Sequence, residues 1–200
     1  MSRRSRFWLY CLALLCVLSG CASSSSIRQV STPDVASLGS KTPTVPRSGA
    51  DLNIATARLQ IPRIGVDAPI EPVGFAGSNL DVPRRNRWTG VGWFNRGPLP
   101  GQRGSAVIDG HLDRPGGVPA VFWNLHQLRV GDSVMVSDNE GHRLRFHVIK
   151  VDQYSPQRAP LQAIFADTSG KFLNLITCEG SWDSVAQQTI LRRVVYTSLD

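Results

Sequence analysis

The sequence predicts an all-β fold, a barrel or sandwich of short strands, preceded by a targeting segment and a linker. Beyond residue 56 the apolar stretches are short, and several alternate apolar with polar residues. Glycine and proline interrupt them often, with 18 and 13 copies in 200 residues. No stretch has the length and periodicity of a long amphipathic helix, which leaves strands as the main elements.

Seven short segments are strand candidates. The clearest pair, 133–137 and 142–148, flanks Asp138-Asn-Glu-Gly141, a turn sequence typical of a β-hairpin. Pro62 lies inside another candidate and is expected at an edge or a strand end, because proline donates no backbone hydrogen bond. We also expect a helical turn within 118–128. In chain order the candidates are 57–64, 68–73, 105–109, 133–137, 142–148, 172–178 and 189–197.

The first twenty residues resemble a secretory signal peptide. Arg3, Arg4 and Arg6 precede an apolar run of twelve residues, 7–18. Twelve residues are too few for a membrane-spanning helix, which needs about 20, but they suit the apolar region of a signal peptide. The alternative is an uncleaved signal anchor. Both interpretations place the rest of the chain outside the cytoplasm.

The sequence Leu18-Ser19-Gly20-Cys21 resembles the lipobox of bacterial lipoproteins, in which the cysteine is lipidated and becomes the mature N-terminus. We therefore expect a signal peptide at 1–20 and a lipoprotein of the bacterial cell envelope, anchored to a membrane by the lipid on Cys21. Residues 21–55 are rich in Ser, Thr and Pro and lack aromatic residues, which predicts a flexible linker. The remaining segment, 56–200, is long enough for one compact core.

Charge and composition argue against several function classes. The net charge of +7 falls to +4 once the three N-terminal arginines leave with the signal peptide. No run of lysine and arginine interleaved with aromatic residues is present, so nucleic-acid binding is not expected. No cluster of acidic, histidine or cysteine residues suggests a metal site, and neither a metal nor a cofactor is expected.

A single thiol remains in the predicted mature domain once Cys21 is lipidated. Cys11 and Cys16 lie in the signal peptide, which leaves Cys178 without a disulfide partner. An unpaired cysteine outside the cytoplasm is either a small buried residue or a reactive nucleophile. Cys178 follows Thr177 at the end of an apolar strand candidate, where a thiol is held rigidly and can still face a cleft.

A thiol nucleophile needs a base, and His111 is the best placed of four histidines. It follows Gly110 just beyond the strand candidate 105–109, and glycine there gives the backbone freedom. Asp113, two residues on, could bond the imidazole or order the loop. The other histidines, explained by a packed segment or by a solvated strand face, are His126, His142 and His147.

The tetrahedral intermediate of acyl transfer needs a donor for its oxyanion. Arg192 and Arg193 precede the apolar run 194–196 on the last strand candidate. Neighbouring side chains on a strand point to opposite faces, so only one arginine can face the cleft and the other should face solvent. We give a slight preference to Arg193, because it directly adjoins the apolar run.

The order of these elements resembles that of the sortases, and of their class F branch in particular. The resemblance is carried by Gly110-His111 after a strand, then Leu175-Ile-Thr-Cys178, then arginine before Val194-Val195. It implies a closed eight-stranded sortase-type β-barrel with short helical turns, and it makes 56–200 the catalytic domain. Upstream segments that add to it, so that it covers essentially all of 57–197, are 59–65, 91–98 and 104–113.

The resemblance also implies an activity. Sortases are cysteine transpeptidases that cleave a sorting motif near the C-terminus of a protein substrate. They then transfer the acyl group from a thioester to an amine acceptor. The matching residues are Cys178 as nucleophile, His111 as acid/base partner, and Arg193 or Arg192 as oxyanion donor, with Asp113 and Thr177 in support.

Two other interpretations stay open at this point. An L,D-transpeptidase also pairs a cysteine with an upstream histidine, although its usual Ser-His-Gly-Cys sequence is absent around Cys178. A sortase-like lipoprotein that has lost catalysis, or that mainly hydrolyses its substrate, would keep the same barrel. A cleft shared by Cys178 and His111 would favour the transpeptidase.

Overall fold

The computed structural model describes residues 52–77 and 79–200. The expectations for residues 1–51, which include the signal peptide, the lipidated Cys21 and most of the linker, lie outside the described residues. Leu52 is already buried and packs in the core, four residues before the expected start of the domain. No helix in the described part of the chain is long and apolar enough to cross a membrane.

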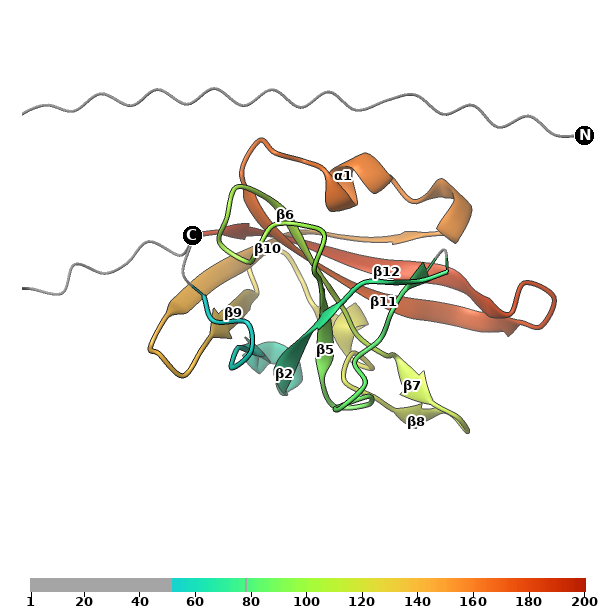
Figure 1. Ribbon diagram of the computed structural model, residues 1–200. Coiled ribbons are helices and arrows are strands. Elements are labelled where there is room, and N and C mark those ends of the chain that lie inside the picture. Colours follow the sequence, from blue (N-terminus) through green and yellow to red (C-terminus); the bar gives the residue numbers. More distant parts are fainter. Residues whose placement is uncertain (1–51, 78) are drawn as a thin grey trace, which may run out of the picture. The chain divides into compact units, whose positions relative to one another are not determined.

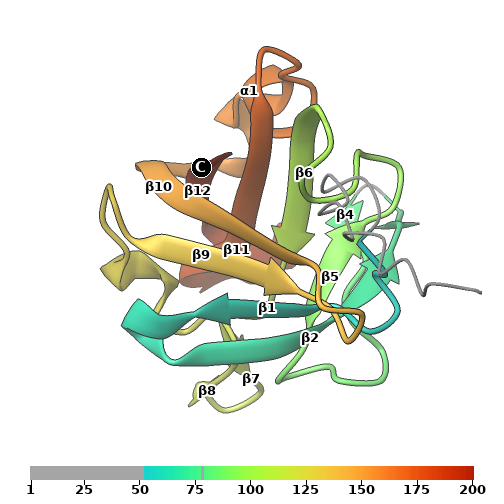
Figure 2. The same cartoon turned by 90° about the vertical axis from the view of Figure 1, so that its left-hand side faces the viewer.

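The described residues form a closed barrel of eight strands, as predicted, in the order β1-β2-β5-β6-β11-β12-β10-β9. Figure 2 shows β10, β9, β1 and β2 lying side by side on one wall. Strand β9 closes the barrel by pairing antiparallel with β1. The barrel strands are β1 (Arg58–Ile61), β2 (Val66–Val73), β5 (Val91–Phe94), β6 (Gly104–Asp109), β9 (Ser133–Ser137), β10 (Arg143–Tyr154), β11 (Lys171–Asp183) and β12 (Gln188–Leu199).

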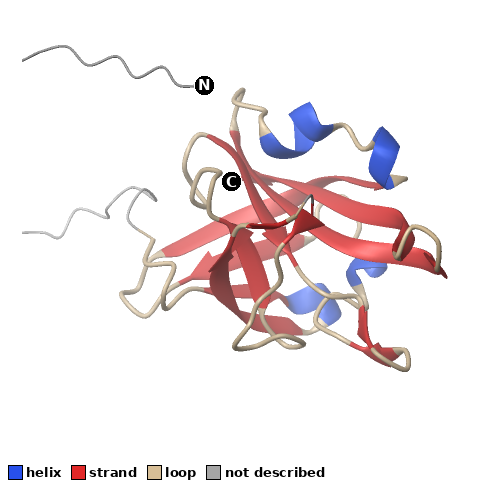
Figure 3. Ribbon diagram, turned by 45° about the vertical axis from the view of Figure 1, so that its right-hand side comes forward, coloured by secondary structure: helices blue, strands red, loops and turns tan. Residues whose placement is uncertain are grey.

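The remaining elements are short and lie outside the barrel wall. Two small hairpins pair β3 (Phe75–Ala76) with β4 (Asn79–Leu80), and β7 (Asp113–Arg114) with β8 (Val118–Pro119). Figure 3 shows that the helical segments are few and peripheral. They are the 3-10 turns η1 (Pro62–Ile64), η2 (Leu125–Gln127) and η3 (Pro156–Arg158), and the helix α1 (Leu161–Phe165).

Two local expectations change, and two are confirmed. The candidate strand 57–64 ends at Ile61, because Pro62 begins the 3-10 turn η1 instead of continuing the strand. Strand β5 was not among the seven candidates, since all four of its residues are buried and none alternates. The hairpin at Asp138–Gly141 and a helical turn within 118–128 are present as predicted, the latter as η2.

Alternating side chains of the barrel strands build two apolar clusters. The larger draws residues from all eight strands, including Leu173 and Leu175, and therefore fills the barrel interior. The smaller includes Val107, Ile176 and Val194 on the outer face, where Ile164 of α1 covers them. Figure 1 shows α1 on the outside of the barrel. Strands β6, β11 and β12 thus have an inner and an outer face, and the outer face carries the site.

Candidate active site

The parallel pairing of β6 with β11 brings His111 beside Cys178. The sequence numbers of paired residues differ by the same amount along this register, and its last pair is Ile176 opposite Asp109. One residue further, the Gly110 N–H donates to the Ile176 carbonyl at 3.1 Å, and the Thr177 hydroxyl donates to the Gly110 carbonyl at 2.7 Å. Strand β6 ends at Asp109, two residues before His111, and these two bonds extend the same register past its end, which directs His111 toward Cys178.

Strand β12 lies on the other side of Cys178. The antiparallel register of β11 and β12 sets Cys178 directly opposite Arg192, and Thr177 opposite Arg193. Residues directly opposite each other in such a pair share a face of the sheet. Cys178 and Arg192 therefore share the outer face, and His111, two residues past the end of β6, continues the same line. We call these three residues the catalytic row.

Cys178 has the exposure that a nucleophile needs. It is a free cysteine and is half-buried, whereas Ile176 and Thr177 before it are buried. Thr177 faces the barrel interior and uses its hydroxyl to hold the Gly110 carbonyl. The thiol is thus carried by a rigid strand and still reaches solvent.

The guanidinium of Arg192 is held only by neutral groups. Its Nη1 donates to the Thr189 carbonyl at 3.0 Å, the Thr189 hydroxyl at 2.9 Å and the Leu191 carbonyl at 2.9 Å, and its Nη2 donates to Gln188 Oε1 at 3.0 Å. All these partners belong to β12 itself. No carboxylate in the described part of the chain lies within ion-pair distance of Arg192, so its charge is available to a substrate.

Arg193 points to the other face and is committed to an ion pair. Its Nη2 donates to Glu179 Oε1 at 2.5 Å, and the two side chains are only 16% and 21% exposed. The expectation that the second arginine faces solvent is therefore wrong. The register favours Arg192 over Arg193 as the partner of Cys178, the reverse of the preference drawn from the sequence, and the assignment itself stays a prediction.

His111 packs against an aromatic ring that the sequence did not point to. The His111 and Trp88 ring centroids are 4.8 Å apart at an interplanar angle of 44°. Desolvation lowers the pKa of His111 below its usual value, the charge of Arg87 lowers it further, and Asp113 opposes both. Asp113 makes no hydrogen bond to the imidazole, and His111 Nε2 is buried without a partner among the described residues. The lowered pKa favours the neutral imidazole, and Nε2 makes no hydrogen bond within the described residues.

Gly110 is required for space. A Cβ added at this position would lie 2.6 Å from Cδ2 of Phe122. Its φ is not among the positive values, so backbone freedom, the reason expected from the sequence, does not apply. Phe122 in turn donates its N–H to the His111 carbonyl at 3.0 Å. Gly110 and Phe122 together fix the segment that carries His111.

Asp109 is a titratable group beside the catalytic row that sequence reasoning missed. It lies opposite Ile176 on β11 and Gly92 on β5, two residues before His111 and on the same face. Burial raises the pKa of Asp109 to about 7, against the opposing effects of the Gly110 N–H and the charge of Arg192. The sequence shows this residue only as the end of an apolar strand, which carries no signal for a perturbed carboxyl group.

The other histidines have partners of their own, away from the row. His126 Nδ1 lies 3.1 Å from the Trp123 carbonyl, and His147 is exposed and paired with Asp200. His142 departs from the solvated face expected for it, because it is half-buried and its Nδ1 lies 2.7 Å from a buried Asp138 carboxylate. No group of three or more potential metal ligands occurs within 52–77 and 79–200.

Comparison with known proteins agrees with this geometry. The sequence matches the sortase domain family over residues 59–200. Sortase C-1 from Actinomyces oris shares 26% identity at a TM-score of 0.58, covering 73% of this chain and 74% of that one. A lid mutant of sortase A from Corynebacterium diphtheriae shares 22% identity at a TM-score of 0.56, and the match covers 73% of this chain and 70% of that one. A sortase D5 transpeptidase from Clostridium perfringens shares 20% identity at a TM-score of 0.53, and the match covers 73% of this chain and 79% of that one.

A search of curated proteins finds no match. The structural likenesses at 20% and 22% identity establish the barrel fold alone. The family match covers most of the chain, including the three members of the catalytic row, and it sets aside the L,D-transpeptidase alternative. It does not distinguish sortase classes, so the class F resemblance remains a prediction. The chain belongs to the sortase family of cysteine transpeptidases.

Proposed function

We propose that the protein cleaves a sorting motif near the C-terminus of a protein substrate through a thioester on Cys178 and passes the acyl group to an amine. The observation that supports this proposal is strand register: Arg192 on β12 lies opposite Cys178, and the β6–β11 pairing that ends at Asp109 leads toward His111. Sortases act on protein substrates with sorting motifs and on amine acceptors. We assign the individual steps of the reaction from the residues of this chain.

In the first half-reaction the Cys178 Sγ attacks the carbonyl carbon of a threonine in the motif, and His111 takes the thiol proton. The tetrahedral intermediate collapses by breaking the peptide C–N bond, and His111 gives its proton to the leaving amine. In the second half-reaction an acceptor amine attacks the thioester, the C–S bond breaks, and the proton returns to Cys178 through His111. The lowered pKa of His111 suits this exchange, because it favours the neutral imidazole, which can first act as a base.

Arg192 is the oxyanion donor in this scheme. Its present hydrogen bonds run to neutral oxygens of its own strand, and exchanging some of them for an oxyanion replaces neutral acceptors by a charged one. Arg193 would have to abandon Glu179 to do the same. Thr177 and Asp113 have supporting roles. Thr177 anchors the segment that carries His111, and the charge of Asp113 opposes the lowering of the His111 pKa.

The membrane anchor is also a proposal. Cys21 carries a lipid in the mature protein, and the domain works outside the cytoplasm at a membrane of the cell envelope. This rests on the lipobox-like sequence before Cys21 alone. Mass spectrometry of the mature N-terminus should find an acylated Cys21, whereas an intact residue 1 would point to a signal anchor.

A peptide library screened for covalent adducts by intact mass would test the reaction. Wild type should accumulate a thioester with peptides that contain the motif, and Cys178→Ala should form none. His111→Ala should be comparably inactive, while His147→Ala, which changes an exposed and remote imidazole, should keep wild-type rates. Thioester formation by Cys178→Ala would refute the nucleophile assignment, and turnover that yields only hydrolysed product would favour a hydrolase.

A further inference from the structure

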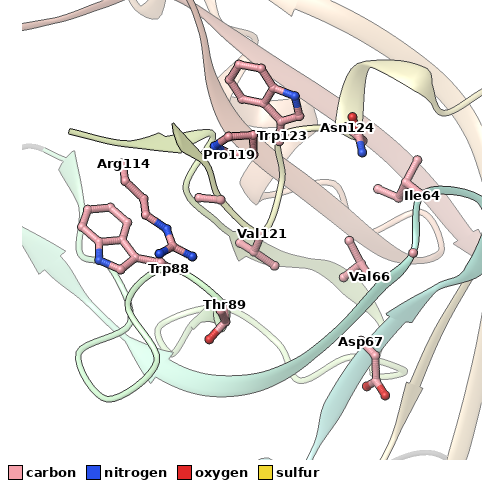
Figure 4. Close-up of a pocket in the computed structure, with 12 residues that line it drawn as sticks. Ile64, Val66, Asp67, Trp88, Thr89, Arg114, Pro119, Val121, Trp123 and Asn124 are labelled. Atoms are coloured by element: carbon pink, nitrogen blue, oxygen red, sulfur yellow. The ribbon is translucent and has the colours of Figure 1, made fainter. Parts of the chain in front are cut away.

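A pocket of about 320 Å³ is lined in part by Trp88, the residue whose ring packs against His111. Figure 4 shows its walls, which come from the β1–β2 connection, the loop before β5, and the β7–β8 hairpin with the segment that follows it. Trp88 and Arg114 lie together at one end, and Asp67 lies at the opposite end. None of the residues that line this pocket takes part in the proposed reaction.

Trp88 joins the pocket to the catalytic row. One side of the residue lines the pocket, and its ring also packs against His111 at 4.8 Å between centroids. Two successive backbone groups hold both residues in place: the Val121 N–H donates to the Trp88 carbonyl and the Phe122 N–H donates to the His111 carbonyl, each at 3.0 Å. A molecule in the pocket therefore lies one aromatic ring away from the catalytic base.

Arg114 gives the pocket an unpaired positive charge. Its side chain forms no hydrogen bond or ion pair with any residue in the described ranges, and its Nε is buried without a partner. Asp67, the acidic residue that lines the same pocket, is engaged by Arg58 at 2.7 Å. A half-buried guanidinium without an acceptor is unfavourable, and a carboxylate would satisfy it with two parallel hydrogen bonds.

We propose that this pocket binds the acceptor, and that the acceptor is an amine carrying a carboxylate, which Arg114 holds while the amine reaches the thioester. The inference rests on the proposed function, because a transpeptidase needs a second substrate and His111 must be reached by it. The positive charges of Arg114 and Arg87 also favour the neutral form of a nearby amine, which is the form that attacks. The attack forms a C–N bond, breaks the C–S bond and sends the amine proton to His111.

The test compares two acceptors that differ only in the carboxylate. A synthetic peptide thioester ending in threonine acylates Cys178 by thiol exchange, and intact mass confirms the adduct. Triglycine or triglycinamide is then added, and the rate of amide formation is measured against acceptor concentration, with hydrolysis of the same thioester as reference. Wild type should reach half-saturation at a triglycine concentration about tenfold or more below that of triglycinamide, as expected for hydrogen bonds to a charged group.

Arg114→Gln should abolish this preference, and Arg114→Lys, which keeps the charge without the planar fork, should retain part of it. Arg143→Gln, which removes an exposed arginine on β10, is the matched control and should keep the full preference. Equal use of the two acceptors by wild type would overturn the proposal. A parallel loss of both acceptors in Arg114→Gln would do the same, since it would mark a structural role.

A binding measurement separates this inference from the proposed function. In Cys178→Ala, triglycine should shift the indole NMR signals of Trp88 and Trp123, which both line the pocket, and triglycinamide should do so only at higher concentration. Absence of any thioester in the kinetic assay would defeat the proposed reaction, whereas absence of these shifts would defeat the pocket assignment alone.

Discussion

Replacing Arg192 and Arg193 separately by glutamine should have different effects: the first should lower kcat, and the second should lower the free energy of unfolding. Arg192 shares the face of Cys178 and is bonded only to neutral groups of β12. Losing one oxyanion donor typically lowers kcat on the order of 10²–10³. Glutamine keeps a polar side chain, so the free energy of unfolding should change by less than about 1 kcal/mol.

Arg193→Gln should show the opposite pattern. The substitution leaves the Glu179 carboxylate without its charged partner at a site where its Oε2 is already buried and unpaired. Both side chains keep some solvent contact, so the cost should be about 1–3 kcal/mol rather than the larger value of a fully buried pair. A Glu179→Gln, Arg193→Gln double variant should recover part of that loss, because no lone charge remains.

The assay combines single-turnover acylation with a peptide thioester and a sorting peptide, and urea unfolding of each variant. The sorting peptide has the poorer leaving group, an amine in place of a thiolate, so its acylation depends more on stabilisation of the tetrahedral intermediate. It should therefore show the larger defect in Arg192→Gln. A loss of 10²-fold or more in Arg193→Gln with unchanged unfolding would refute the argument from strand register, as would a mild effect of Arg192→Gln.

Three further outcomes follow from single contacts. Gly110→Ala should destabilise the fold by about 1–3 kcal/mol in urea and slow acylation, because its Cβ would meet the Phe122 ring at 2.6 Å, and Phe122→Leu in the same chain should restore part of both. Asp109 has its pKa raised from 3.8 to about 7, so the folded state binds the extra proton and stability falls as pH rises through that window. Asp109→Asn should flatten this fall in pH-dependent unfolding, and an unchanged slope would contradict it. His142→Ala should cost about 1 kcal/mol, because the buried Asp138 loses its imidazole partner, yet leave acylation rates unchanged.

The sequence was sufficient for the barrel, and it singled out Cys178 and His111 as candidates for the nucleophile and its base. Short alternating segments predicted most of the strands, and the position of Cys178 at the end of an apolar run gave a rigid thiol. It could not predict the neighbours of His111. Trp88 reaches the imidazole from a loop that carries no periodic pattern, and Asp109 differs from other strand residues only through the desolvation that the folded wall imposes.

The sequence could not decide between the two arginines for a different physical reason. A slip of one residue in strand pairing moves every side chain to the other face. The β11–β12 register contains an irregularity between Glu179 and Trp182, and Gly180 there has φ +77°. The number of residues between Cys178 and the two arginines therefore does not determine which one shares its face. Only the pairing beyond the irregularity, Cys178 opposite Arg192, settles the geometry.

The distance along the chain between His111 and Cys178 explains why one glycine matters so much. Strands β7 to β10 and helix α1 all lie between these two residues, so nothing local holds them together. Gly110 does so from three directions: its N–H binds the Ile176 carbonyl, its carbonyl accepts from Thr177, and its open face admits the Phe122 ring. Thr177 and Gly110 are thus positioning residues, and the Thr-Cys and Gly-His pairs of the sequence are two halves of one contact. In each pair the first residue joins the two segments, and the second is the residue to which we assign the chemistry.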